Sequence, residues 1–175
     1  MLNKRSMILA GIVLTAAATR LLPHPPNFTP IAAMALFGGA YLADRRMAFL
    51  VPMAAMFMAD LFIGLHILMP LVYLSFALTV LLGIWLGPRL RPGSILAAAL
   101  VSSILFFLVT NFGVWAFFDS YPHTWAGLVA CYVAAIPYFQ HTLAGSMIYS
   151  GVLFGGFALL QARFPTIAAA PTRST

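Results

Sequence analysis

The chain has 175 residues, of which 63% are hydrophobic and only 7% are charged. Soluble domains are about 45–50% apolar and about 25% charged, so this composition excludes a soluble globular protein, a disordered segment and a secreted disulfide scaffold. It indicates an integral membrane protein, and at about 20 residues per crossing no length remains for a soluble catalytic domain. The net charge of +6 comes from small basic groups between apolar runs, which is typical of membrane orientation and not of nucleic-acid binding.

Six predicted spans follow one another, separated by loops rich in charge, proline or glycine. The apolar runs cover residues 6–22, 29–43, 47–66, 67–87, 95–118 and 127–162. The second run is only about 22 Å long, so we expect it to be tilted, kinked or re-entrant. The last is too long for one crossing, and we expect Pro137 to break it into a short piece and a full crossing. These features predict an all-α membrane domain over residues 1–164 and a disordered cytoplasmic tail over 165–175.

The basic residues predict the orientation of the chain. With the N-terminus inside, eight of the nine basic residues fall on the inner side and only Arg20 on the outer side. This positive-inside bias predicts a bacterial inner-membrane protein with both termini in the cytoplasm. The first run also has the pattern of a signal peptide, with Ala16-Ala17-Ala18 as a cleavage site. We expect the run to be retained, because it continues through Leu21-Leu22.

Asp60 is the sharpest polar signal in the apolar runs. A carboxylate inside a membrane helix is costly, and such residues usually face a bundle interior or a watery cavity with a partner. The topology places Asp60 in the outer half of the third run, at a depth similar to that of Arg20. We therefore expect the two residues to pair or to hold a polar ligand jointly. The alternative is a pair that only fixes the register of the helices.

Other polar and aromatic residues gather on the same outer side. Asn111 and Trp115 lie one helical turn apart and share a face, which suits a planar ligand that stacks and accepts a hydrogen bond. The alternative for Trp115 is an ordinary interfacial aromatic belt. His141, at the head of the last crossing, is a further candidate to line a pocket. The four histidines lack HxxxH or HExxH spacing, so no metal site and no cofactor are predicted.

Small residues at four-residue spacing predict a close helix contact. Ala35, Gly39 and Ala43 form such a face on the second run. Intramolecular packing is one explanation, and docking of a partner membrane protein is the other. The chain has no GxxxxGK[ST] and no GxSxG motif, so we expect neither ATP binding through a P-loop nor a nucleophile elbow.

Several of these residues belong to a recognisable pattern. It comprises RLLPHPPNFTP at residues 20–30, AAMALFGGA at 32–40, DLFIG at 60–64, TNFGVW at 110–115 and AIPYF at 135–139. The pattern resembles an uncharacterised family of small bacterial six-span membrane proteins over about residues 15–160. More distantly, the small-residue run followed by a helix bearing Asp-Leu-x-x-Gly resembles the substrate-binding S components of energy-coupling-factor (ECF) transporters. The Met-His start of cobalt and nickel S components is absent, since residue 2 is Leu2.

The second resemblance implies a function and a set of site residues. S components bind a solute from outside and borrow ATPases and a coupling membrane subunit, so the chain is expected to be a non-enzymatic binding subunit for a small, planar solute. The face of Ala35, Gly39 and Ala43 would then dock the coupling subunit. A structural or assembly protein is the alternative, and a membrane-embedded hydrolase using Asp60 and His141 is a third. The ligand-binding residues expected from the polar pattern and this resemblance are Arg20, Asn27, Asp60, Asn111, Trp115, Tyr138 and His141.

Overall fold

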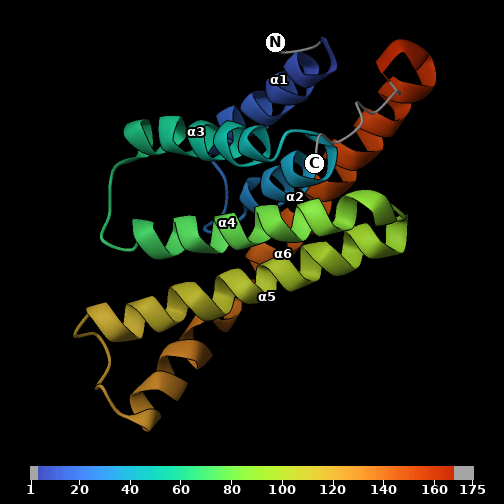
Figure 1. The fold of residues 1–175 in the computed structure, drawn as a ribbon. Coiled ribbons are helices and arrows are strands. Elements are labelled where there is room, and N and C mark those ends of the chain that lie inside the picture. Colours follow the sequence, from blue (N-terminus) through green and yellow to red (C-terminus); the bar gives the residue numbers. More distant parts are fainter. Residues whose placement is uncertain (1–3, 168–175) are drawn as a thin grey trace.

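A computed structural model describes residues 4–167, and the regular elements in that range are all helices (Figure 1). The predicted all-α class is therefore confirmed for this part of the chain. The α-helices are α1 Lys4–Ala18, α2 Ile31–Tyr41, α3 Arg45–Ile63, α4 Met69–Leu86, α5 Pro92–Phe117 and α6 Trp125–Arg163. Three short 3-10 turns accompany them: η1 Thr19–Leu21, η2 Gly87–Arg89 and η3 Pro165–Ile167. The turn η3 lies within the predicted tail, and residues 168–175 of that tail lie outside the described residues.

Four helical segments are long and apolar enough to cross a membrane: α3, α4 with η2, α5 and α6. Helix α1 has 15 residues and α2 has 11, which at 1.5 Å per residue is about 22 Å and about 16 Å. A hydrocarbon core is about 30 Å thick, so neither helix reaches across it alone. The expected short second helix is present. The helices support a membrane protein, but six complete spans are not established by their lengths.

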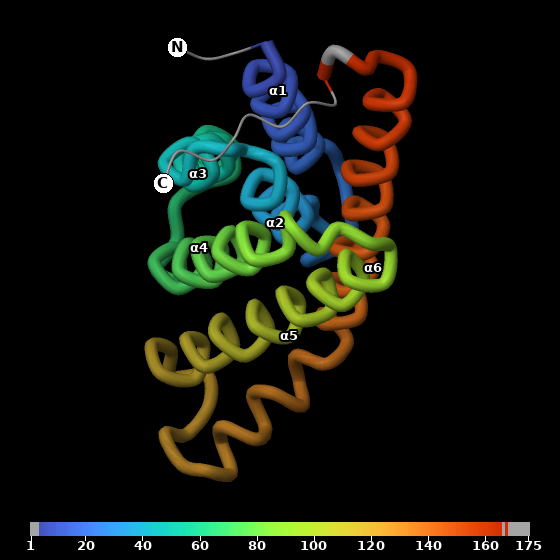
Figure 2. The backbone as a smooth tube through the Cα atoms, turned by 45° about the vertical axis from the view of Figure 1, so that its right-hand side comes forward, coloured from blue at the N-terminus to red at the C-terminus, as the bar shows by residue number. Residues whose placement is uncertain are grey.

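The last helix differs from the prediction. Pro137 was expected to divide the final stretch, yet α6 runs without interruption through Pro137 over 39 residues. A proline inside a helix removes one backbone hydrogen bond and bends the helix, but it does not always end it. Figure 2 shows α6 changing direction along its length. The proline therefore does not break this helix.

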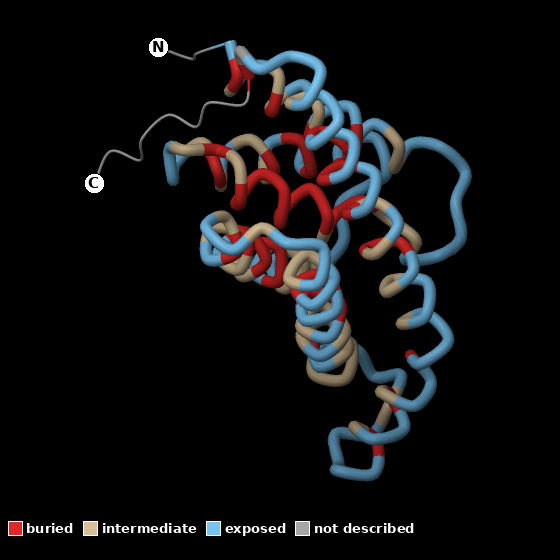
Figure 3. Tube along the Cα trace, turned by 90° about the vertical axis from the view of Figure 1, so that its right-hand side faces the viewer, coloured by how far each residue is buried: buried red, intermediate tan, exposed pale blue. Residues whose placement is uncertain are grey.

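Helix α2 is the centre of the molecule, and nine of its residues are buried (Figure 3). Its contact with α4 depends on two glycines. A Cβ on Gly39 would lie 2.9 Å from the backbone nitrogen of Ile84, and a Cβ on Gly83 would lie 3.0 Å from the Cα of Leu36. Both distances are shorter than ordinary contacts, so the two backbones approach as closely as they do because neither residue has a side chain.

Helices α3, α4 and α5 are joined so that successive helices run in opposite directions (Figure 1). The α3–α4 and α5–α6 connections lie at one end, and the α4–α5 connection lies at the other. At its start, α3 is capped by Asp44, whose carboxylate accepts hydrogen bonds from the backbone N–H groups of Arg46 and Met47. Many large apolar side chains of these helices are exposed, as a lipid-facing surface requires.

Candidate functional site

A cavity of about 320 Å³ lies among α4, α5, α6 and the segment that leads into α2. This volume is at the lower end of the range for small-molecule sites, which is about 300–1,000 Å³. Its apolar lining includes the aromatic rings of Phe76, Phe106, Phe107 and Phe139. Its polar lining is mostly uncharged, with Ser, Thr and Asn side chains from all sides. Such a surface fits a small organic molecule with a flat ring and a few polar groups.

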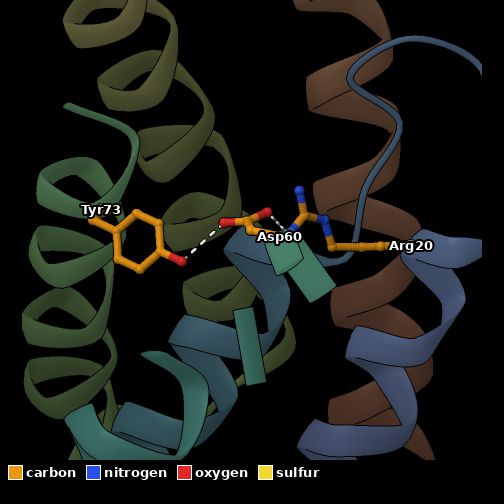
Figure 4. A network of polar contacts seen from close by, with 3 residues as sticks. All are labelled: Arg20, Asp60 and Tyr73. Carbon is orange, nitrogen blue, oxygen red and sulfur yellow. Dashed lines mark hydrogen bonds and ion pairs between the residues drawn. The ribbon is translucent and has the colours of Figure 1, made fainter. Parts of the chain in front are cut away.

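Among the described residues, the cavity lining contains one arginine, Arg20, and no lysine. Asp60 forms an ion pair with Arg20. Arg20 Nη1 donates to Asp60 Oδ1 at 2.8 Å, and the Tyr73 hydroxyl donates to Asp60 Oδ2 at 2.8 Å. Figure 4 shows Asp60 between the two donors. Asp60 is only 2% exposed, so both of its oxygens need partners away from water. The predicted pair of Arg20 and Asp60 is therefore formed.

Three different elements bring this network together. Arg20 lies in η1, the turn that follows α1, and Tyr73 lies in the first turns of α4. Asp60 lies in the last turn of α3, where its carbonyl accepts the N–H of Gly64 at 2.8 Å. Gly64 has φ +117°, a conformation that glycine adopts readily and other residues rarely do. The end of α3 thus fixes the depth of the carboxylate, while η1 and α4 supply its two donors.

Four of the residues predicted to bind ligand line the cavity: Arg20, Asn27, Asn111 and Tyr138. Asn27 comes from the loop before α2 and has φ +63°. Asn111 Nδ2 donates to the Phe107 carbonyl, one turn back in α5, at 2.8 Å. Asp60 does not belong to the lining, and its contact with the cavity runs through Arg20.

Trp115 and His141 lie outside the lining. The Trp115 indole N–H donates to the Pro122 carbonyl at 3.0 Å, and its ring packs edge-on against His123. It shares a helix with Asn111, but it contacts the α5–α6 loop. His141 Nδ1 lies 3.1 Å from the Pro26 carbonyl and so joins α6 to the loop that carries Asn27. Of these two loops, the one before α2 supplies a lining residue, Asn27, and the α5–α6 loop supplies none.

The small-residue face of α2 is turned into the molecule. Ala35 is fully buried, and Gly39 lies against Val80, Gly83 and Ile84 of α4. Ala43, which follows α2, is half-buried. Intramolecular packing, one of the two explanations for this spacing, accounts for Ala35 and Gly39. These two residues are not on a surface that a partner could reach in this structure.

Two groups of site residues were not predicted from the sequence. Tyr73 completes the Asp60 network, and Ser75, Thr79, Ser102 and Ser146 are buried hydroxyl residues that line the cavity. A signal for some of them was present, because Ser75 and Thr79 are four residues apart, as are Thr142 and Ser146. Hydroxyls at this spacing share one helix face. No sequence pattern pointed to Tyr73.

In the described part of the chain, no three side chains of His, Cys, Asp or Glu lie close enough together to hold a metal ion. The cavity instead offers hydroxyls, amides, aromatic rings and a paired guanidinium. These groups can bind and orient a small organic molecule by hydrogen bonding and stacking.

The chain matches the model of a family of unknown function, DUF6580, over residues 1–167. No curated protein and no solved structure matches it. These comparisons agree with the resemblance to an uncharacterised family and give no support to a likeness to ECF S components. The chain belongs to the DUF6580 family.

Proposed function

We propose that this protein is a membrane-embedded binding subunit for a small, planar solute. The observation that supports this best is the cavity of about 320 Å³, which is lined by aromatic rings and uncharged polar side chains. Unfilled space of this kind is no advantage to a helix bundle that only has to pack, because its walls forfeit dispersion contacts with one another. A purely structural protein would gain stability by filling it.

The solute enters from the extracytoplasmic side in this proposal. The cavity lies towards the end of the molecule that carries the α3–α4 connection, since His66 and Leu68 belong to its lining. Arg45 and Arg46 begin α3, and Arg89 ends the turn η2 that follows α4. These basic residues therefore lie at the opposite end of the molecule from the α3–α4 connection. The positive-inside rule places that basic end in the cytoplasm.

Transport requires energy from partners in this proposal. An ECF-type arrangement would supply it through ATPases and a coupling membrane subunit, as the sequence pattern implies. Because Ala35 and Gly39 pack against α4, the coupling subunit would have to dock on another face. The runner-up is a structural or assembly protein, in which the Arg20–Asp60 pair only locks the helices.

The experiment is affinity purification in mild detergent, followed by mass spectrometry of the proteins and of the small molecules released. A matched pair of variants makes it specific. Ala135→Phe places a ring in the cavity, since Ala135 lines it and is buried, whereas Ala134→Phe adds the same ring at the exposed neighbouring position. Wild type and Ala134→Phe are expected to retain a small molecule that Ala135→Phe loses.

Co-purified ATPases with a second membrane protein would support the transport part of the proposal. If wild type and both variants release the same small molecules and bring no ATPase, the structural reading is favoured instead. Size-exclusion profiles of the three proteins separate loss of binding from loss of folding.

A further inference from the structure

Six of the hydroxyl groups that line the cavity share one hydrogen-bonding direction. Each donates its proton to a carbonyl of its own helix, three or four residues back, at 2.8–3.1 Å. A hydroxyl has one proton and two lone pairs, so these groups keep only acceptor capacity for a ligand. The six residues, two from each of α4, α5 and α6, are Ser75, Thr79, Ser102, Thr110, Thr142 and Ser146.

Asn111 also offers the cavity a hydrogen-bond acceptor. Its Nδ2 donates to the Phe107 carbonyl, which leaves the side-chain oxygen as an acceptor. The helical walls of the cavity are therefore rich in acceptors. Other donors of the lining include the Tyr138 hydroxyl on α6 and, on the loop side, the Thr29 hydroxyl and Arg20 Nε, which is buried without a hydrogen-bond partner.

An anionic ligand fits this arrangement poorly. Carboxylate or phosphate oxygens would face the lone pairs of the helical hydroxyls, and buried acceptors without a donor are costly. The charge of Arg20 is already neutralised by Asp60 at 2.8 Å. A planar neutral group with N–H donors satisfies the hydroxyl oxygens, while a carbonyl on the same molecule can accept from the loop side.

We infer that the solute is an uncharged, planar compound whose N–H groups point at the hydroxyls of α4, α5 and α6. This inference rests on the proposed function and names the chemical class that the cavity selects. An aromatic amide is the simplest example: it carries a ring, an NH₂ donor and a carbonyl acceptor.

Three probes of nearly the same shape test the inference: benzamide, acetophenone and benzoate. Acetophenone replaces the NH₂ group by a methyl group, and benzoate replaces it by a charged oxygen. Binding is measured by ligand-observed NMR titration of the full chain in lipid nanodiscs, with empty nanodiscs subtracted to remove partitioning into lipid. Benzamide is expected to bind at least about tenfold more tightly than either analogue, because only benzamide satisfies the hydroxyl oxygens.

Two neighbouring serines of α5 provide a matched pair of variants. Ser102 and Ser103 are both buried and both donate to the Ala99 carbonyl, at 2.9 and 2.8 Å, but only Ser102 lines the cavity. Ser102→Ala is expected to weaken benzamide binding about fivefold or more and to leave acetophenone binding unchanged. Ser103→Ala is expected to leave both unchanged.

Four results would overturn the inference. Equal binding of benzamide and acetophenone, or preferential binding of benzoate, would show that the cavity binds small molecules without the stated polarity, so the proposed function would survive. Loss of benzamide binding in Ser103→Ala as well would place the probe elsewhere. Failure of all three probes to bind would refute the stated chemical class, while recovery of a released solute that Ala135→Phe loses would still support the binding function.

Discussion

Asp60 and Arg20 form an ion pair among the helices, where burying charge is costly. The carboxylate is almost fully buried and accepts from Arg20 and Tyr73, both at 2.8 Å. Removing one partner of a buried ion pair costs more than the pair itself contributes, because an unpaired charge remains. Arg20 has its Nε buried without a partner, so Asp60 is the contact that neutralises it.

Asp60→Asn is expected to lower the free energy of unfolding by about 3 kcal/mol, since it leaves the Arg20 charge unpaired. SDS-induced unfolding in bicelles measures the change. The double variant Arg20→Gln with Asp60→Asn is expected to recover part of the loss, because no unpaired charge remains.

Asp44→Asn is the control for this substitution. It makes the same chemical change at an exposed helix cap, where Asn serves about as well as Asp, so stability is expected to stay within about 0.5 kcal/mol. A double variant as unstable as Asp60→Asn alone would argue against the charge as the cause. Unchanged benzamide binding in a destabilised Asp60→Asn protein would assign the pair a structural role only.

At the scale of the elements, α2 depends on backbone contact more than on side chains. Its residues Gly38 and Gly39 leave room for Pro52 of α3 and for the backbone of α4, respectively. Such contact between helices is available only to small residues, and in a membrane it replaces the hydrophobic driving force that is absent there. A helix too short to span the bilayer is thereby held inside the bundle.

Gly39→Ala is expected to destabilise the fold by about 2 kcal/mol or more, because its new methyl group would overlap the backbone of α4. Gly155→Ala in α6 is the matched control, since nothing lies within 4 Å of a Cβ there. The control is expected to be neutral or stabilising by up to about 1 kcal/mol, as alanine favours a helix over glycine. Equal effects in the two variants, measured by the same unfolding assay, would refute the close α2–α4 contact.

At the scale of the whole molecule, the arrangement of α3, α4 and α5 defines two ends. The basic residues at the start of α3 and between α4 and α5 mark the end that we propose faces the cytoplasm. The α3–α4 and α5–α6 connections mark the other end, where the cavity residues His66 and Leu68 lie.

Cysteine labelling tests these two ends in a Cys131→Ala background, where the buried native thiol has been removed. A membrane-impermeant maleimide is expected to label Leu65→Cys and Ser120→Cys in spheroplasts of expressing bacteria. Gly93→Cys, exposed in the first turn of α5, is expected to react only after the membranes are opened. Labelling of Leu65→Cys and Gly93→Cys from the same side would contradict a crossing by α4.

Several features were decided by local sequence. Composition and the lengths of the apolar runs predicted helices suited to a membrane, because a bilayer leaves a backbone few other ways to satisfy its hydrogen bonds. The cost of a buried carboxylate singled out Asp60, and the single outer-side arginine singled out its partner. Proline alone was a poor guide at Pro137, since surrounding helix contacts can outweigh one missing hydrogen bond.

The tertiary structure decided which of these residues meet. Asn111 faces the cavity while Trp115, on the same helix, contacts a loop, because helix rotation depends on packing against neighbours. The same packing turned the α2 small-residue face inward and brought Tyr73 to Asp60. The sequence by itself was therefore enough to predict apolar helices suited to a bilayer and the Arg20–Asp60 pair, through local composition and the cost of burying charge. Only packing between distant segments determined the cavity and the residues that line it.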